Sequence, residues 1–286
     1  MVWRCRERVF DLQDRVLVMG VLNVTPDSFS DGGRFVEPAA AIDQGRRLLE
    51  EGADLLDIGG ESTRPGSSPV PAEEQWRRVG PVVTRLAGEG ACVSIDTSLS
   101  AVAERAIGAG AQVVNDITAL RDPAMGPLAA RAGVGLVLMH LQGSPATMQL
   151  DPRYDDVLGE VAAALAERRQ AARRAGVADE NLALDPGIGF GKTLGHNLAL
   201  LAGLSQLSAL GRPLVVGVSR KSFLGKLLDL PVDQRLEAGL AAAVIAVFEG
   251  ARIVRTHDVA PTKRATRVAQ ALRSTRAGEA IDLDRG

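Results

Sequence analysis

Polar and ionisable residues recur along this chain at the points where short apolar segments end. Asn23 follows the apolar segment Val16–Leu22, and the same event recurs further along the chain. The later endings are Asp57 with Glu61, Asp96, Asn115 with Asp116, His140, Asp185, Ser219 with Lys221, and Arg255 with His257. A lone asparagine at such a position would be a turn residue, and a single acid such as Asp57 or Asp116 could cap the next helix. A whole series of such endings is harder to explain in that way, and we predict that these residues share one site.

The predicted site has a carboxylate side and a cationic side. Asp96 and Asp185 supply the carboxylates, whereas Lys221, Arg255 and His257 supply the cations. The sequence lacks a G-x-S-x-G nucleophile motif, and its 3 histidines offer no cage for a catalytic zinc ion. Such a pocket can hold a polar aromatic or amide-rich substrate and bind an anionic leaving group. The predicted chemistry is therefore group transfer with loss of phosphate or diphosphate.

The apolar segments indicate β-strands, because the first of them is rich in β-branched residues without polar alternation, as in parallel strands covered on both faces. The expected strands are Val16–Leu22, Leu55–Ile58, Val93–Ile95, Val113–Asn115, Gly135–Met139, Leu182–Leu184, Leu214–Val218 and Arg252–Val254. The expected helices are Pro38–Glu51, Ala72–Ala87, Ser100–Ala109, Pro123–Ala132, Tyr154–Ala175, His196–Leu204, Gln234–Phe248 and Pro261–Arg273. This alternation without linkers predicts an α/β fold of a single domain, a (β/α)8 TIM barrel, whose active site lies at the carboxyl ends of the strands.

A doubly wound open sheet is the alternative fold. It usually carries a glycine-rich turn after its first strand, where this chain has N-V-T-P-D. The segment Gly187–Thr193 is similar to a phosphate loop but follows Pro186 where that loop requires glycine, so we do not expect nucleotide binding there. In the barrel, anions are expected near Lys221, Arg255 and His257, because these residues follow its last two strands.

Composition restricts the partners and the location of the chain. It has 286 residues and a net charge of −2, which gives no electrostatic footprint for nucleic acid or for an anionic membrane. The sequence has no signal peptide and no apolar run of about 18 residues. Cys5 and Cys92 lack any metal-ligand spacing, and Cys92 is expected in the core. We therefore expect a reduced, cytoplasmic protein that binds small molecules.

The two ends of the chain are expected to be peripheral. The arginine-rich start with Arg4, Arg6 and Arg8 is interpreted as a solvated edge, and the segment Val9–Asp14 as the edge of a hairpin. The barrel is placed at residues 1–275. Residues 276–286 have no helical period and are expected to form a disordered tail.

Several longer motifs in this chain resemble those of a known enzyme family. They are N-V-T-P-D-S-F-S-D-G-G, D-I-G-G-E-S-T-R-P-G, V-S-I-D-T, V-N-D-I, L-A-L-D-P-G-I-G-F-G-K, S-R-K-S-F-L-G and I-V-R-T-H-D. In this order, between Val16 and Ala271, they resemble dihydropteroate synthase. The resemblance implies a barrel, usually a homodimer, that joins 7,8-dihydropterin-6-ylmethyl diphosphate to 4-aminobenzoate in folate biosynthesis, releases diphosphate, and is a sulfonamide target.

Carried over by position, the resemblance assigns the residues of the site to parts of the substrates. Around the pterin it places Asp96, Asn115, Asp185 and Lys221, with Met139 against the ring face. It assigns Arg255, His257 and Asn23 to the diphosphate, with Asn23 also holding Mg²⁺. For the 4-aminobenzoate, or a sulfonamide in its place, it assigns Thr63, Arg64, Pro65, Phe29, Phe190 and Ser219. The residues expected to carry catalysis are Asp96, Asp185, Lys221 and Arg255.

The residue types suit the roles that the resemblance implies. An aniline nitrogen is neutral at about pH 7 and needs no strong general base, and departure of diphosphate leaves a positive charge that carboxylates stabilise. We expect an SN1-like transfer in which the loops 24–35 and 60–71 close over the intermediate and exclude water.

Three alternatives remain beside this interpretation. A pterin-binding methyltransferase barrel would share the carboxylate side of the pocket but has no use for S-R-K-S or R-T-H. A non-catalytic pterin-binding barrel would not need the intact loops. A synthase insensitive to sulfonamides would have rebuilt its aminobenzoate loops, whereas S-T-R-P-G is unaltered here.

Overall fold

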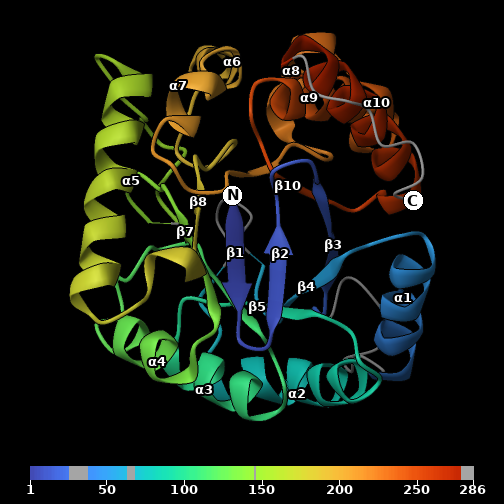
Figure 1. Ribbon diagram of the computed structural model, residues 1–286, viewed down its shortest axis with the longest axis vertical. Coiled ribbons are helices and arrows are strands. Elements are labelled where there is room, and N and C mark those ends of the chain that lie inside the picture. The colour runs from blue at the N-terminus through green and yellow to red at the C-terminus, as the bar shows by residue number, and fades with distance from the viewer. Residues whose placement is uncertain (26–37, 63–67, 145, 278–286) are drawn as a thin grey trace.

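The computed structural model describes residues 1–25, 38–62, 68–144 and 146–277. Within these residues, parallel strands form a barrel in the spatial order β8-β7-β6-β5-β4-β3-β10-β9. Their bounds are β3 Leu17–Asn23, β4 Leu55–Gly59, β5 Val93–Asp96, β6 Val113–Asp116, β7 Gly135–Met139, β8 Leu182–Asp185, β9 Val215–Gly217 and β10 Ile253–Thr256. A bridge between Leu184 and Leu214 joins β8 to the chain just before β9 and closes the sheet. The predicted (β/α)8 TIM barrel is confirmed (Figure 1).

The strands are buried on both faces, as their composition predicts. Every residue of β4 and β7 is buried, and β3 is buried up to Asn23 at its end. Several strands run one residue further than predicted and so include the polar group that follows the apolar segment. Asp96, Asp116 and Asp185 are thus the last residues of β5, β6 and β8. Because parallel strands end at the same side of a barrel, these groups lie on one rim.

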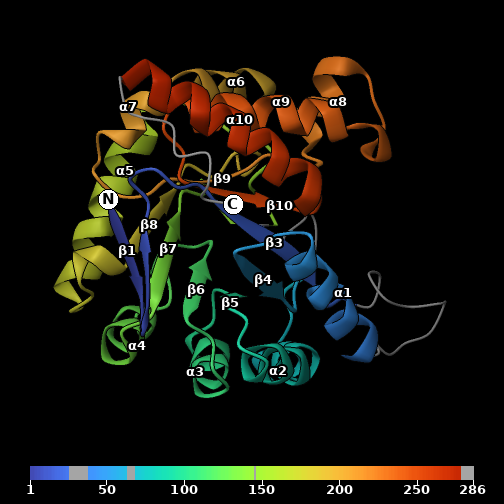
Figure 2. The same ribbon diagram turned by 45° about the vertical axis from the view of Figure 1, so that its right-hand side comes forward.

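Helices cover the outside of the barrel (Figures 1 and 2). They are α1 Pro38–Glu50, α2 Ala72–Gly88, α3 Ser100–Gly108, α4 Met125–Ala132, α5 Val157–Arg174, α6 Leu194–Ala202, α7 Leu204–Ser208, α8 Ser222–Leu228, α9 Leu236–Phe248 and α10 Val259–Ala277. Short 3-10 turns lie at Asp179–Asn181 and Val232–Gln234. The sequence prediction missed α8, which lies inside the S-R-K-S-F-L-G motif and is too short to show a helical period.

Capping side chains explain where two helices begin. The expected start of α5 at Tyr154 was three positions early, because the Asp156 carboxylate accepts hydrogen bonds from backbone N–H groups in the first turn and fixes the start at Val157. In α6, Thr193 and His196 form a reciprocal capping box. This helix therefore begins at Leu194 and not at His196.

A β-hairpin closes the amino-terminal end of the barrel. Its strands β1 (Val2–Cys5) and β2 (Arg8–Asp11) pair antiparallel, and Trp3 and Cys5 are fully buried among residues that point into the barrel. Arg4 is exposed, but Arg6 and Arg8 are half-buried and donate to backbone carbonyls. The predicted solvated edge is therefore only one face of this segment, and its other face is core.

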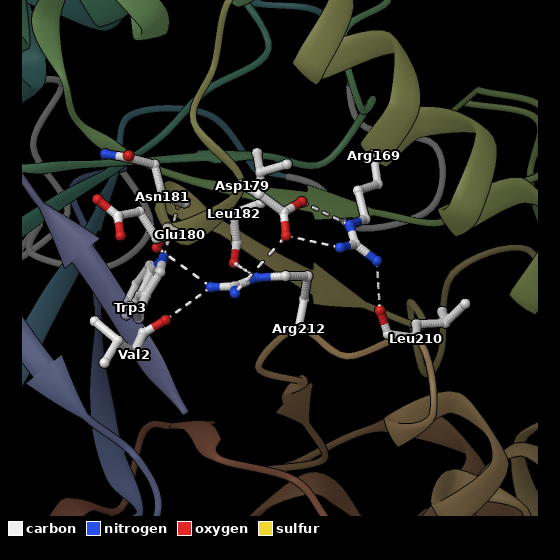
Figure 3. A network of polar contacts seen from close by, with 9 residues as sticks. All are labelled: Val2, Trp3, Arg169, Asp179, Glu180, Asn181, Leu182, Leu210 and Arg212. Atoms are coloured by element: carbon white, nitrogen blue, oxygen red, sulfur yellow. Dashed lines mark hydrogen bonds and ion pairs between the residues drawn. The ribbon is translucent and has the colours of Figure 1, made fainter.

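A polar network fastens the hairpin to the barrel (Figure 3). Arg212 donates from Nε to the Leu182 carbonyl at 3.1 Å and from Nη2 to the Val2 carbonyl at 2.8 Å and the Glu180 carbonyl at 3.3 Å. The Trp3 indole donates to the Asn181 carbonyl at 2.9 Å. Because Arg212 is 8% exposed, these bonds are shielded from water and hold β1 against the start of β8.

Replacing Arg212 by methionine should destabilise the protein and leave its activity unchanged. The change removes a buried charged donor from several carbonyls, which costs about 2–3 kcal/mol, or a drop in Tm of roughly 5–10 °C for a chain of this size. Thermal unfolding with steady-state kinetics at a permissive temperature checks this. Arg4→Met is the control, because Arg4 forms an exposed ion pair with Glu180 and such pairs contribute about 0–1 kcal/mol. Equal losses in both variants would contradict the assignment.

The carboxyl-terminal helix α10 continues to Ala277, two residues past the boundary expected at 275. Residues 278–286 of the expected tail lie outside the described residues. Among the helices of the described residues, none is long and apolar enough to cross a membrane.

Candidate active site

The register of the strands brings the predicted pterin residues side by side. Asp96 on β5 pairs with Gly59 of β4 on one side and with Asn115 of β6 on the other. Met139 on β7 pairs with Asp185 of β8. Register partners in parallel strands point to the same face of a sheet, so these side chains all face the inside of the barrel at the carboxyl rim. Because Asn115 pairs with Val137, Met139 and Asp185 lie one inward-facing position further along their strands than Asp96 and Asn115. The structure thus brings together Asp96, Asn115, Met139 and Asp185 as the sequence predicted.

A network of two acids and one arginine occupies the carboxylate side of this rim. Arg255 donates from Nε to Asp57 Oδ2 at 2.6 Å and from Nη2 to Asp96 Oδ2 at 2.8 Å. Asp57 is fully buried and also accepts from Ser94 Oγ at 2.6 Å and from Asn115 Nδ2 at 2.9 Å. The Arg255 guanidinium is thereby fixed against the carboxylates on the inner side of the rim.

Burial and charge shift the pKa values in this network. Burial, reinforced by the neighbouring Asp57 carboxylate, raises the pKa of Asp96 to about 7, although Arg255 acts against the shift. Burial opposes the charge of Arg255, but the carboxylates of Asp57 and Asp96 outweigh it and raise the Arg255 pKa. Strongly perturbed carboxyl groups in a pocket are typical of a functional site.

Lys221 follows β9 and lies above the ring of Phe190. Its Nζ is 4.0 Å from the ring centroid, and burial and the nearby Arg255 charge lower the Lys221 pKa to about 8.

Asp185 is 7% exposed and its Oδ1 accepts from the Gly187 N–H at 2.7 Å. Asp185 therefore anchors the loop that carries Phe190.

This loop is a tight glycine turn with a buried lysine inside it. Gly187 has φ +69°, and a Cβ there would collide with the carbonyl oxygen of His140, so no other residue fits. Lys192 is 3% exposed, and its Nζ donates to the carbonyls of Gly187 at 3.0 Å and Phe190 at 2.9 Å and lies 3.1 Å from His140 Nδ1. In the segment that is similar to a phosphate loop, the lysine is thus turned inward and bound to backbone carbonyls of its own turn.

The end of β10 and the segment after β9 meet at the cationic corner of the rim. Ser219 Oγ lies 3.2 Å from His257 Nδ1 and donates to Asp258 Oδ2 at 3.3 Å. Burial and the charge of Arg255 lower the His257 pKa to about 3. His257 is therefore neutral at physiological pH in the free protein and can donate a hydrogen bond from one ring nitrogen. The sequence had predicted a cation at this position.

Asn23 and the described ends of the second loop complete the rim. Asn23 ends β3, and its Oδ1 faces Gly59, the register partner of Asp96. Glu61 accepts from the Val70 N–H at 3.2 Å and from Gln75 Nε2 at 2.8 Å, and so ties together the two ends of that loop. The described residues contain no group of three or more His, Cys, Asp or Glu that could hold a metal ion.

The remaining predicted contacts belong to the 4-aminobenzoate. Phe29, Thr63, Arg64 and Pro65 lie outside the described residues, as does most of the loop 24–35. Their assignment to the 4-aminobenzoate stays a prediction.

Two residues of the site had no assigned role in the sequence prediction. Asp57 was considered as a helix cap, but its partners are Ser94, Asn115 and Arg255 inside the barrel. Asp116 does not cap a helix either, because its carboxylate accepts from the Thr118 and Leu120 N–H groups of the turn after β6, whereas α4 begins only at Met125. Lys192 is the last residue of the motif L-A-L-D-P-G-I-G-F-G-K. Its position within this glycine-rich turn could have identified it as a residue of the site.

Known proteins match this chain over nearly its whole length. The family model described as "Pterin binding enzyme" matches residues 19–257. The dihydropteroate synthase of Escherichia coli (strain K12) is 46% identical over 260 residues, which are 91% of this chain and 92% of that protein.

Solved structures agree with the family match. The Yersinia pestis dihydropteroate synthase with a sulfonamide drug complex has a TM-score of 0.90 and 46% identity, and the match covers 96% of this chain and 100% of that chain. The Xanthomonas albilineans dihydropteroate synthase with 4-aminobenzoic acid has a TM-score of 0.89 and 46% identity, covering 96% and 99%. With the rim of acids, asparagine and cations described above, these matches show that the chain belongs to the dihydropteroate synthase family of pterin-binding enzymes.

Proposed function

We propose that the rim joins 7,8-dihydropterin-6-ylmethyl diphosphate to 4-aminobenzoate by an SN1-like transfer. The overall reaction is that of the family: a transferase step of folate biosynthesis that gives 7,8-dihydropteroate and diphosphate. The observation that carries the proposal is the placement of acceptors and donors on one rim. Asp96, Asn115 and Asp185 line one side, and Lys221 and Arg255 face them.

The pterin ring suits the carboxylate side of the pocket. Its amino and N–H groups are donors, which match the carboxylates of Asp96 and Asp185 and the amide oxygen of Asn115. Lys221 can donate to the ring oxo group, and Met139 can pack against the ring face. Buried, charge-assisted hydrogen bonds of this kind provide both affinity and orientation.

The diphosphate is assigned to the cationic corner, with Arg255, His257 and Asn23 around it. Burial lowers the His257 pKa in the free protein, and a bound diphosphate would raise it again, so His257 can donate to the diphosphate from the neutral or the protonated ring. Asn23 offers one amide oxygen at the rim, and this fits Mg²⁺, which is commonly bound by one or two protein oxygens together with substrate phosphates. Bound Mg²⁺ would neutralise charge that develops on the leaving diphosphate.

The residues of the chain divide the work of the transfer. The carboxylates of Asp96 and Asp185 stabilise the positive charge that forms on the pterin methylene, and Arg255 stabilises the departing anion. After the bond between the pterin methylene and the diphosphate oxygen has broken, the 4-aminobenzoate nitrogen forms a bond to the methylene without a general base, and the resulting ammonium releases its proton to water or to the departed diphosphate. Phe190 and Ser219 border the proposed position of the 4-aminobenzoate, and Thr63, Arg64, Pro65 and Phe29 are proposed to complete it.

The direct test is turnover of the pterin diphosphate with 4-aminobenzoate, with and without Mg²⁺. The release of diphosphate measures this turnover. Both substrates and the metal should be required. A pterin-binding barrel without catalysis would bind the pterin and release no diphosphate. A methyltransferase barrel would not consume 4-aminobenzoate.

The rate should fall at acid pH because Asp96 must be ionised to accept from the pterin. Its raised pKa, about 7, means that the free enzyme gains a proton there as the pH falls through 7. We expect kcat/KM for the pterin diphosphate to decline below that pH, since this parameter reports the free enzyme. A profile that stays flat down to about pH 5 would contradict the role of Asp96.

A sulfonamide should compete with 4-aminobenzoate, because its sulfonyl group can replace the carboxylate. The solved relative from Yersinia pestis is described as a sulfonamide drug complex, and S-T-R-P-G is intact in this chain. Steady-state inhibition at varied 4-aminobenzoate should raise the apparent KM and leave kcat unchanged. Insensitivity at concentrations well above the KM would favour the drug-insensitive alternative.

We also infer that the chain forms a homodimer through α8, α9 and α10, which lie next to one another (Figure 2). These helices and the segment between α8 and α9 carry exposed apolar side chains at Leu227, Leu228, Val232, Leu236, Ile245, Val268 and Leu272. Exposed apolar groups that gather in one region commonly mark an interface. Sedimentation equilibrium tests this, and a monomer at micromolar concentration would refute it.

A cytoplasmic location is proposed on the basis of the cysteines. Cys5 and Cys92 are buried free thiols in the described part of the chain. Unpaired thiols are typical of a reducing compartment.

A further inference from the structure

The fully buried carboxylate of Asp57 joins residues from separate strands of the barrel. Asp57 lies on β4 and accepts from Ser94 on β5, Asn115 on β6 and Arg255 on β10. Asn115 and Arg255 have assigned roles toward the substrate, whereas Asp57 has none. A carboxylate with no exposed surface is costly unless its partners compensate for it, so its location calls for an explanation.

The bond to Asn115 selects one orientation of an amide. A carboxylate can only accept hydrogen bonds, so it binds the Nδ2 group of Asn115 and repels the Oδ1 atom. The 2.9 Å bond between Asn115 Nδ2 and Asp57 Oδ2 therefore turns the amide oxygen away from Asp57. Asn115 lies beside Asp96 in the sheet register. In this orientation it presents a third acceptor beside the two catalytic carboxylates.

The bond to Arg255 fixes a guanidinium in the same way. Arg255 Nε is taken by Asp57 at 2.6 Å and Nη2 by Asp96 at 2.8 Å. Two hydrogen bonds from different nitrogens fix the orientation of the guanidinium plane. A single hydrogen bond to one carboxylate would leave that plane free to rotate. Asp57 therefore sets the position of Arg255 relative to Asp96.

We propose that Asp57 is a positioning residue of the reaction, which orients the Asn115 amide as an acceptor for the pterin and holds Arg255 beside Asp96. The inference rests on the proposed function, because it concerns the same pterin pocket. Asp57 contacts no substrate itself and acts through its two partners.

The test uses Asp57→Asn in the full chain, with Asp54→Asn as the matched control. Asp54 lies just before β4, has a side chain that is 6% exposed and forms an ion pair with Lys263 at 2.8 Å, but it lies at the opposite end of the barrel. An asparagine at position 57 can donate as well as accept, so it no longer discriminates between the two orientations of Asn115. We expect kcat/KM for the pterin diphosphate to fall about ten- to a hundredfold and the 4-aminobenzoate KM to stay near the wild-type value.

Measurements of pterin binding distinguish a positioning role of Asp57 from a general loss of structure in the Asp57→Asn variant. By calorimetry, 6-hydroxymethyl-7,8-dihydropterin should bind Asp57→Asn about tenfold more weakly, a loss of about 1.4 kcal/mol, and Asp54→Asn as tightly as the wild type. In an Asn115→Ala background the Asp57→Asn change should weaken binding much less, because Asn115 transmits the effect. Full additivity in this cycle, or equal losses in both aspartate variants, would overturn the proposal.

A milder variant covers the case in which Asp57→Asn does not fold. Ser94→Ala removes the hydroxyl that holds Asp57 Oδ1 at 2.6 Å and keeps the carboxylate. It should weaken pterin binding a few-fold, and unchanged binding would overturn the proposal. If the wild-type enzyme does not join the two substrates, the proposed function fails. If the wild-type enzyme is active but Asp57→Asn binds the pterin normally, only the positioning role of Asp57 is refuted.

Discussion

Replacing Asp185 by asparagine should lower kcat/KM for the pterin diphosphate by ten- to a hundredfold or more, with the fold retained. The amide oxygen of asparagine can still accept from the Gly187 N–H, which Asp185 now binds at 2.7 Å, so the glycine turn should keep its shape. What is lost is the negative charge beside the pterin. Charge-assisted hydrogen bonds contribute about 1.5–3 kcal/mol, and every 1.4 kcal/mol is tenfold.

The measurement is steady-state kinetics with thermal unfolding of the same preparation. Asp54→Asn is again the control, because it neutralises a buried, ion-paired acid at the other end of the barrel. Near-normal kcat/KM in both Asp185→Asn and Asp96→Asn would refute the assignment of the pterin to this side of the rim.

The architecture could be predicted because each strand carries its own signal. Val16–Leu22 and Gly135–Met139 are apolar with no polar alternation, and each is followed by polar residues within a few positions. Burial of β3 and β7 on both faces confirms that interpretation. The polar ending of a strand is equally local, which is why Asp96, Asn115 and Asp185 could be identified without a structure.

The pairings within the site could not be predicted, because they depend on closure of the barrel. Arg255 and Asp57 are separated by 198 positions in the chain, and nothing near either residue indicates the other. The sequence assigned Arg255 to the diphosphate, whereas in the structure its Nε and Nη2 atoms are bound to acids. Closure alone brings β10 beside β3 and within reach of β4.

The sequence predicted a hairpin edge at Val9–Asp14, where β2 lies, but the first strand of the hairpin and its buried face were missed for a different reason. The strands of the hairpin are four residues long and alternate buried and exposed side chains. The charged residues Arg4 and Arg8 therefore interrupt the sequence pattern of the buried residues Trp3, Cys5 and Phe10. Contacts with the barrel show that this face is covered, because Trp3 and Cys5 pack beside Gly135 of β7 and the network of Arg212 and Asn181 binds β1 to the start of β8 (Figure 3). Short alternating strands therefore need the partner surface before their role can be recognised.

Replacing Arg255 by methionine should remove both activity and a large part of the stability at neutral pH. The change leaves Asp57, which is fully buried, and Asp96, whose side chain is 11% exposed, without their shared cation. Breaking a buried ion pair on one side costs about 3–5 kcal/mol. Chemical denaturation between pH 4 and pH 8 measures the loss, and diphosphate release measures the activity.

The loss of stability should depend on pH with a defined sign. The Asp96 pKa, already raised to about 7 with Arg255 present, should rise further in the variant, so the folded state binds a proton more tightly than the unfolded state does. Stability then falls as the pH rises from the unfolded value of about 4 through the folded pKa. The difference between wild type and Arg255→Met should therefore be smallest near pH 4 and largest at pH 8. Arg255→Lys keeps the charge but cannot bind both carboxylates through separate nitrogens, so it should recover part of the stability and little of the activity. A pH-independent difference, or full activity in Arg255→Lys, would show that the guanidinium does not compensate the two acids in the way the structure indicates.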